Sequence, residues 1–190
     1  MEIFPYAWNV HETRDGHLTI RAFGMNDQNE SVYVAIQNFL PYIYIELPAH
    51  IDWQEYKVST VRTKLDSLVP SYARASYKLH LKKRKLYYAK GSFDNEDNYQ
   101  DKMYSFLKCG FKSTSHIRQF VNKLSKPVYV DGVGNLKFKV HEMDANPVLQ
   151  FMCAKNIKPA GWFSFKPFYQ PVIGDDKEST CDHEIGRAHV

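Results

Sequence analysis

The sequence lacks the run of about 20 apolar residues that a membrane-spanning helix needs. Its first ten residues, MEIFPYAWNV, have neither the basic start nor the apolar block of a signal peptide. Cysteine is scarce: Cys109, Cys153 and Cys181 are odd in number and far apart, with no CxxC pair. This spacing excludes a zinc ribbon and a disulfide framework, so we expect reduced, structural cysteines. We therefore expect a soluble, intracellular protein.

Common catalytic signatures are also missing. The sequence has no phosphate-binding glycine loop, no GxSxG, no HExxH and no aromatic strand signature of an RNA-recognition motif. HEMD brings His141 and Asp144 close in sequence, and CDHE at 181–184 also looks like a ligand set. Alternation along a strand would point His141, Glu142 and Asp144 in different directions. We interpret both groups as structural and predict no metal site.

The composition is that of a globular protein. A chain of 190 residues suits one domain, or one domain with the beginning of another. Aromatic residues make up 15%, with 13 Tyr and 12 Phe, which is enough for a sizeable core or a stacking surface. The net charge of +4 is too mild to identify a nucleic-acid partner. The distribution of charge therefore matters more than the total.

The first fifty residues predict an antiparallel β-meander. Alternation puts four large side chains on one face of the first strand: Phe4, Tyr6, Trp8 and Val10. The Asp-Gly pair at 15–16 predicts a tight hairpin, and alternation resumes over 18–22 and 32–36. Residues 39–48, FLPYIYIELP, predict a fourth strand with a proline near its start.

Helices and strands alternate after this meander. Apolar spacing predicts a helix over 58–68, a strand over 75–90 and then an acidic, unpatterned loop over 93–101. From 103 to 165 the order is β-α-β-α-β. Its helices are expected at 113–125, capped by Ser or Thr, and from Asn146-Pro147, with Val148, Leu149 and Met152 inward. The fold class is therefore α+β, an N-terminal antiparallel β-meander followed by a β-α-β-α-β segment.

A basic cluster is the candidate binding site. Its members are Lys78, Lys82, Lys83, Arg84, Lys85, Tyr87 and Tyr88. Cations beside aromatic rings suit a nucleic-acid backbone, because the cations neutralise phosphates and the rings stack on bases or sugars. The alternative is a solvated strand edge whose charges block association between sheets. The acidic loop that follows would partly neutralise the cluster, so both interpretations stay open.

Two segments resemble a known family. Residues 137–165, KFKVHEMDANPVLQFMCAKNIKPAGWFSF, are followed by KESTCDHE at 177–184, and 39–48 are FLPYIYIELP. Together they resemble the N-terminal region of family B DNA polymerases, most of all those of large eukaryotic DNA viruses. The shared features are a strand ending in an acidic residue, an NPVLQFM helix and an I-x-x-x-G-W motif. These are packing motifs, and their combination over most of residues 1–184 carries the resemblance.

The resemblance implies a division of the chain. Residues 1–166 would be the polymerase N-terminal domain, and 167–184 would link it to a missing 3′–5′ exonuclease domain. Residues 185–190, IGRAHV, equal the one-frame translation of a common sequencing-adapter stretch. We expect them to be an artefact and the chain to be a fragment; the alternative is a genuine polar tail.

The resemblance also implies a function. The full-length enzyme would be a DNA-directed DNA polymerase with exonuclease and polymerase sites that each use two metal ions, with Mg²⁺ expected. The first exonuclease motif of the family is Asp-x-Glu on a strand. Acidic pairs such as Asp175–Asp176 lack that context, so we expect no catalytic residue in this chain and no cofactor bound to it. The fragment would be a scaffold that binds the single-stranded template through the basic cluster.

Its expected partners are template and primer-template DNA and the remaining domains of the same chain, with no membrane. The compartment, host nucleus or cytoplasmic viral factory, stays undecided. One alternative is a self-contained, non-enzymatic module that binds single-stranded nucleic acid. Another is a structural or interaction domain with no nucleic-acid role. Whether the coding sequence continues past Glu184 separates the polymerase fragment from the self-contained module. Absence of binding to single-stranded DNA would favour the structural or interaction domain.

Overall fold

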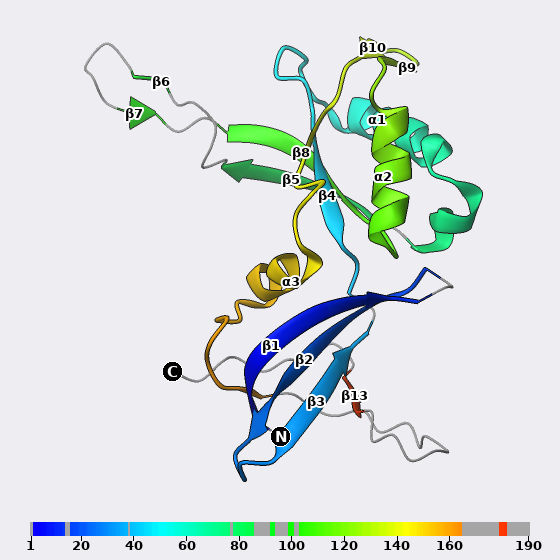
Figure 1. The fold of residues 1–190 in the computed structure, drawn as a ribbon. Coiled ribbons are helices and arrows are strands. Elements are labelled where there is room, and N and C mark those ends of the chain that lie inside the picture. The colour runs from blue at the N-terminus through cyan, green and yellow to red at the C-terminus, as the bar shows by residue number, and fades with distance from the viewer. Residues whose placement is uncertain are drawn as a thin grey trace. The chain divides into compact units, whose positions relative to one another are not determined.

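A computed structural model gives the fold (Figure 1). It describes residues 2–13, 16–37, 39–76, 78–85, 92–93, 99–100, 103–164 and 179–181, with side chains for 2–13, 16–37, 39–73 and 105–164. The chain forms two compact units. The first comprises residues 1–41 and 144–190, and the second comprises residues 42–143. Helices accompany mostly antiparallel sheets, which confirms the predicted α+β class.

The first unit is built on a five-stranded sheet in the order β12-β1-β2-β3-β13. Its strands are β1 (Glu2–Glu12), β2 (Leu18–Asn26), β3 (Ser31–Ile36), β12 (Phe163–Ser164) and β13 (Ser179–Cys181). β1, β2 and β3 pair antiparallel, so the predicted meander is confirmed for three strands, and β13 runs parallel to β3. The β1–β2 hairpin turns through Gly16, whose φ of 74° suits glycine.

A β-bulge divides β1 into two parts. The register with β2 shifts between Pro5 and Ala7, and the extra residue reverses which side chains face which way. Phe4 stands opposite Met25, whereas Trp8 stands opposite Ala22. Met25 and Ala22 are three residues apart on a regular strand and so belong to opposite faces. The prediction that Phe4 and Trp8 share a face is therefore wrong.

One face of this sheet forms the core of the first unit with α3 (Pro147–Lys155). The ring of Trp8 lies 5.6 Å from that of Phe163, and both belong to this core face. α3 begins as predicted, because the Asn146 side chain accepts a hydrogen bond from Val148 N at 2.8 Å and Pro147 follows it. The predicted inward position of Leu149 is wrong.

Helical spacing explains that error. Leu149 is 57% exposed, whereas Phe151, three residues after the buried Val148, is 1% exposed. Residues three and four apart share a helix face, so Phe151 and Met152 join Val148 in the core. The helix ends at Asn156, which adopts the left-handed conformation with φ 54°.

The second unit has a four-stranded antiparallel sheet in the order β11-β4-β8-β5. Its strands are β4 (Tyr42–Glu46), β5 (Lys78–Lys85), β8 (Met103–Gly110) and β11 (Lys139–His141). β4 corresponds to the predicted fourth strand of the meander, but it belongs to this second sheet. Tyr42 to Ile45 are all buried. Ile43 and Ile45 belong to the hydrophobic core, whereas Tyr42 and Tyr44 lie on the other face, where their rings contact each other and Lys108.

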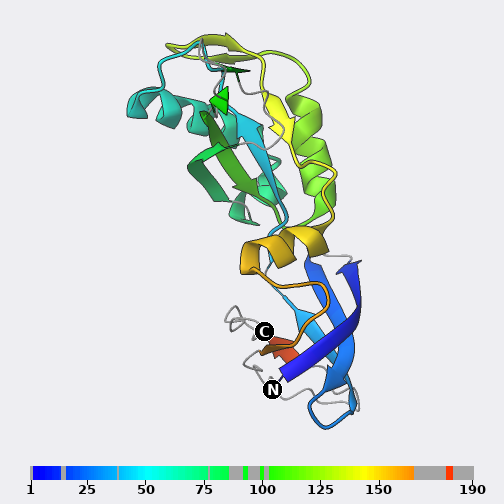
Figure 2. The same cartoon turned by 90° about the vertical axis from the view of Figure 1, so that its left-hand side faces the viewer.

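Two helices cover one face of this sheet, as Figures 1 and 2 show. They are α1 (Glu55–Leu68) and α2 (Thr114–Lys123), close to the predicted ranges. The core between sheet and helices contains Ile43, Leu107, Val61 and Phe120, each fully buried. α2 starts with the predicted cap, in which the Ser113 hydroxyl accepts a hydrogen bond from a backbone N–H of the first turn.

Short elements complete the fold. They are η1 (Ser71–Ser76), β6 (Ser92–Phe93), β7 (Tyr99–Gln100), β9 (Val128–Val130) and β10 (Gly134–Leu136). β6 pairs with β7 inside the predicted loop, whereas 94–98 lie outside the described residues. The strand predicted around Leu136, Phe138 and Val140 is two short strands in different sheets. No helix of the described residues is long and apolar enough to cross a membrane.

Candidate nucleic-acid interface

The basic cluster lies largely on β5, the edge strand of the second unit. Lys78, Lys82, Lys83, Arg84 and Lys85 all belong to this strand, whereas Tyr87 and Tyr88 lie outside the described residues. β5 pairs antiparallel with β8 over its whole length. An edge position suits both open interpretations, because an edge strand is accessible to a ligand and also needs protection from other strands.

The register of β5 divides the cluster between two faces. Lys82 stands opposite Phe106, and Leu81 stands opposite Leu107. Cross-strand partners share a face, so positions 78, 82 and 84 belong to the face of Phe106. Positions 83 and 85 belong to the face of Leu107, which packs against the helices. One binding surface can therefore include Lys78, Lys82 and Arg84 but not the whole cluster.

A row of rings and a cation lies on the Phe106 face. Lys108 Nζ is 3.6 Å from the centroid of the Tyr42 ring and 5.8 Å from that of Tyr44. The Tyr44 ring meets the Phe106 ring edge-on, with 6.0 Å between centroids. Cations over tyrosine rings are stabilised by the ring quadrupole. This row was not predicted from the sequence, although the alternating tyrosines of YIYIE indicate a common face.

His141 lies on the same face and bonds to a partner that the sequence did not indicate. Its Nε2 is 2.7 Å from Glu46 Oε2, and its ring meets Phe106 edge-on at 5.5 Å. The sequence placed His141 near Asp144, but Asp144 is exposed. The His141–Glu46 contact joins β11 to β4. It therefore gives His141 a structural role.

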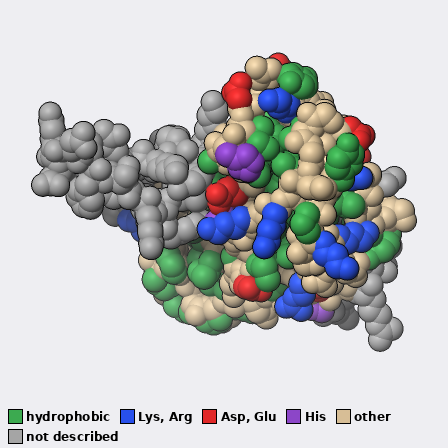
Figure 3. All heavy atoms as spheres, turned by 90° about the horizontal axis from the view of Figure 1, so that it is seen from above, with side chains coloured by type: hydrophobic (Ala, Val, Ile, Leu, Met, Phe, Trp, Pro, Cys, Tyr) green, Lys and Arg blue, Asp and Glu red, His purple; other side chains and the backbone are tan. Residues whose placement is uncertain are grey.

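Figure 3 shows how charge is distributed on the face seen from above. Lys and Arg side chains are interspersed with hydrophobic, neutral and acidic ones on this face. No single basic block forms among the described side chains in this view. The spread agrees with the mild net charge of +4.

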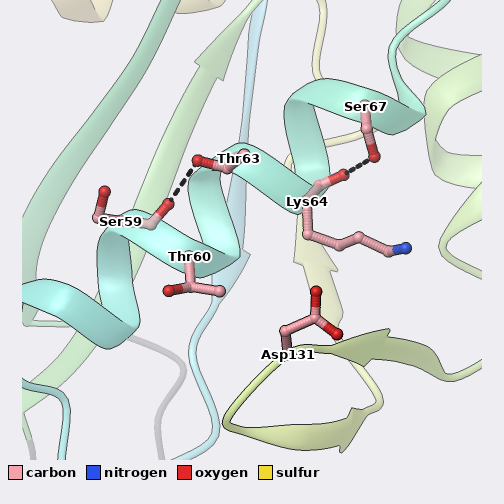
Figure 4. A pocket seen from close by; sticks show the side chains of 6 residues that line it. All are labelled: Ser59, Thr60, Thr63, Lys64, Ser67 and Asp131. Atoms are coloured by element: carbon pink, nitrogen blue, oxygen red, sulfur yellow. Dashed lines mark hydrogen bonds between the residues drawn. The ribbon is translucent and has the colours of Figure 1, made fainter.

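An open pocket of about 320 Å³ lies beside α1 (Figure 4). Its lining residues are mostly hydroxylic: Ser59, Thr60, Thr63, Lys64, Ser67 and Asp131. The hydroxyls of Thr63 and Ser67 donate to backbone carbonyls of the same helix, at 3.1 and 2.6 Å. Its two charged residues are Lys64 and Asp131.

Metal-binding groups are not found in the part of the chain that the structure describes. There, no three His, Cys, Asp or Glu side chains come close enough to hold an ion. Cys109 is buried and Cys153 is exposed, and both are free thiols. Burial raises the pKa of the Cys109 thiol. CDHE lies mostly outside the described residues, so its interpretation stays a prediction.

The chain resembles known DNA polymerases in sequence and in fold. The chain is 33% identical over 167 residues to DNA polymerase 120R of Invertebrate iridescent virus 3, covering 86% of this chain. It is 27% identical over 203 residues to DNA polymerase 037L of Invertebrate iridescent virus 6, covering 96%. Its fold matches the family B DNA polymerase from Pyrobaculum calidifontis with a TM-score of 0.64 and 16% identity, over 100% of this chain and 20% of that one.

The chain is homologous to a region of viral DNA polymerases, and its fold matches that of a family B DNA polymerase. The resemblance inferred from residues 39–48 and 137–165 is therefore confirmed. The chain matches no protein-family model. It spans 14% and 16% of the length of the two iridescent virus polymerases.

This polymerase region brings only part of the predicted site together. Positions 78, 82 and 84 share a sheet face with Tyr42, Tyr44 and Lys108, although the two groups are far apart in sequence. Positions 83 and 85 lie on the opposite face of the sheet, because alternate residues of a strand face opposite ways. The predicted DNA contacts of all these residues remain predictions.

Proposed function

We propose that this chain is the N-terminal part of a DNA-directed DNA polymerase that also has 3′–5′ exonuclease activity. The coverage of the relatives carries the proposal, since viral DNA polymerases match 86% to 96% of this chain but only 14% to 16% of their own length. The whole enzyme would act on primer-template DNA with Mg²⁺. The test is to sequence the natural gene past codon 184 from an independent library.

Either result of that sequencing is informative. Polymerase motifs in frame, such as YGDTDS, support the proposal. A stop codon directly after codon 184 favours the self-contained module that binds single-stranded nucleic acid.

Within the enzyme, this region is a scaffold and contacts the single-stranded template. The scaffold role is supported by the buried core of each unit. The template contact would be made by Lys78, Lys82 and Arg84, whose positions share one face. These cations would neutralise phosphates of the strand.

The register supplies a matched control for this contact. Lys82→Gln with Arg84→Gln removes two charges from the Phe106 face, and Lys83→Gln with Lys85→Gln removes two from the other face. We expect the first pair to weaken oligodeoxythymidylate binding. It should also lower the slope of log affinity against log salt by roughly 1.4, or about 0.7 per lost phosphate contact. The second pair should leave the slope unchanged.

Equal effects of the two pairs would favour a general effect of charge. If neither pair changes the affinity or its salt dependence, the charges of β5 serve to block association between sheet edges.

We propose one catalytic assignment that was not made from the sequence, where no catalytic residue was expected because the acidic pairs lacked the context of a strand. Asp182 and Glu184 have the Asp-x-Glu spacing and directly follow β13 in the sequence, although both lie outside the described residues. We infer that they are the first exonuclease motif. Asp182→Ala with Glu184→Ala in the full-length enzyme should abolish exonuclease activity and leave DNA synthesis intact.

A further inference from the structure

The face of the first unit's sheet that points away from α3 carries an aromatic surface. Cross-strand partners place Phe4 beside Met25, and Phe23 beside Tyr33. Asn9 stands opposite Arg21 on the same face. Trp162, directly ahead of β12, joins the surface through its contact with Phe4. We call these residues the aromatic face: Phe4, Arg21, Phe23, Met25, Tyr33 and Trp162.

The rings of the aromatic face form two pairs. Phe23 and Tyr33 have centroids 5.2 Å apart, and Phe4 and Trp162 have centroids 5.7 Å apart. Met25 is 40% exposed and Trp162 is 39% exposed, so the surface reaches solvent. The bulge at Pro5 is what places Phe4 here instead of in the core. The sheet thus presents ring pairs on its outer side as well as on its inner side.

Arg21 gives this face a donor that lacks an acceptor. Its guanidinium carbon lies 5.8 Å from the centroid of the Tyr33 ring. Its Nε is buried, and no hydrogen-bond acceptor lies within reach among the described residues. A buried donor without an acceptor is unfavourable, and a ligand oxygen that reached this guanidinium would offset that cost. Arginine donates well to phosphate and base oxygens.

The remaining positions of the face are compatible with a polyanion. Asn9, His11, Thr19 and Ser31 occupy neighbouring positions and carry no negative charge. Among the described strand positions of this face, Glu2 at the start of β1 is the one carboxylate. Rings, one guanidinium and neutral hydrogen-bonding groups on a sheet are the chemistry that holds unpaired bases. An acidic protein segment would leave the paired rings unused.

We propose that the aromatic face binds single-stranded nucleic acid by stacking bases on its ring pairs, while Arg21 donates to a phosphate or base oxygen. The inference rests on the proposed function, because a template strand is the single strand that this polymerase region would meet. It assigns stacking to the first unit, whereas the charge contact proposed above belongs to β5 of the second unit.

The test compares two strands of equal length and charge. Fluorescence anisotropy measures binding of the full 190-residue chain to labelled oligodeoxythymidylate and to an abasic strand. Phe23→Leu with Tyr33→Leu keeps two apolar side chains but removes stacking. We expect binding of oligodeoxythymidylate to weaken about tenfold or more, because each stacked base contributes that much. Binding of the abasic strand should not change.

Two further variants keep the test decisive. Tyr129→Leu removes an aromatic residue that is 58% exposed in the other unit, and it should leave both affinities unchanged. Trp162→Leu removes an exposed ring outside the regular strands, and should weaken oligodeoxythymidylate binding even if the double variant fails to fold. Circular dichroism checks folding in each case. Photo-crosslinking of 5-iodouracil in the strand should label peptides of the aromatic face.

The outcomes separate the two proposals. If Trp162→Leu and the double variant bind oligodeoxythymidylate like the unchanged chain, while Lys82→Gln with Arg84→Gln weakens it, the aromatic face is wrong and the template contact stands. If the unchanged chain binds neither strand, both the template contact and the aromatic face are wrong. If the variants lose as much affinity for the abasic strand as for oligodeoxythymidylate, base stacking is wrong as well. Crosslinks found only outside the aromatic face would overturn it as well.

Discussion

His141 Nε2 and Glu46 Oε2 lie 2.7 Å apart and join two strands that are 95 residues apart in sequence. Both side chains are largely buried, at 7% and 18% exposed. The imidazole also meets the Phe106 ring edge-on. This contact fixes the short strand β11, which has only three residues, to the centre of its sheet.

Removing one partner of this pair should destabilise the fold. Glu46→Ala removes the carboxylate that contacts the imidazole, and His141→Ala leaves a carboxylate in a poorly solvated place. Each should lower the free energy of unfolding by about 1–3 kcal/mol. Urea denaturation measures this, and a double-mutant cycle separates the pair from the individual losses. Additive effects of the two substitutions would show that the contact contributes nothing of its own.

The two described cysteines should differ in reactivity. The thiolate is the reactive form, and burial raises the pKa of Cys109, so at neutral pH this residue remains a buried thiol. In a Cys181→Ser background, iodoacetamide should label the exposed Cys153 and spare Cys109. Mass spectrometry of peptides measures the labelling. In urea, Cys109 and Cys153 should be labelled to the same extent. Rapid labelling of Cys109 in the native chain would contradict the buried position.

Gly24 should tolerate no side chain. A Cβ at this position would lie 2.3 Å from the carbonyl oxygen of Phe4 and 2.8 Å from Ile3 Cγ1. Because the close atom is backbone of the neighbouring strand, Gly24→Ala should lower the free energy of unfolding by about 1–3 kcal/mol. Gly161→Ala is the control, since its Cβ would meet only Lys158 Cβ at an ordinary 3.7 Å. Similar stability of the two variants would argue against the pairing of β1 with β2 at this register.

α3 offers a sharp contrast between neighbouring apolar residues. Phe151→Ala should cost about 3–5 kcal/mol, because it leaves a cavity between Trp8 and Phe39, whose rings contact Phe151. Leu149→Ala changes an exposed residue and should stay within about 0.5 kcal/mol. Chemical denaturation of both variants decides which residue faces the core. A larger loss for Leu149→Ala would restore the orientation predicted from sequence.

Features set by neighbours in the chain were predictable from sequence. The caps of α2 and α3 depend on hydrogen bonds that span two or three residues, so Ser113 and Asn146 marked both helix starts correctly. The hairpin at Gly16 is equally local. The basic strand was also recognised, and its alternation already implied that Lys82 and Lys83 point to different faces.

Features set by distant partners were not predictable. The bulge at Pro5 exists only as a register against β2, and the periodicity of β1 alone gave the wrong face for Phe4. The sheet to which β4 belongs depends on β8 and β11, which follow about sixty and ninety residues later. For the same reason, the row of Tyr42, Tyr44 and Lys108 was missed.

The division of the chain has a consequence for its synthesis. The second unit is continuous, from Tyr42 to Met143, whereas the first is built from residues on both sides of it. On the ribosome, β1, β2 and β3 emerge first, yet their inner face is covered by Phe151 and Phe163 only after the second unit has been made. The nascent chain therefore carries an uncovered apolar sheet while the whole second unit is translated. That interval is when molecular chaperones would have most to bind.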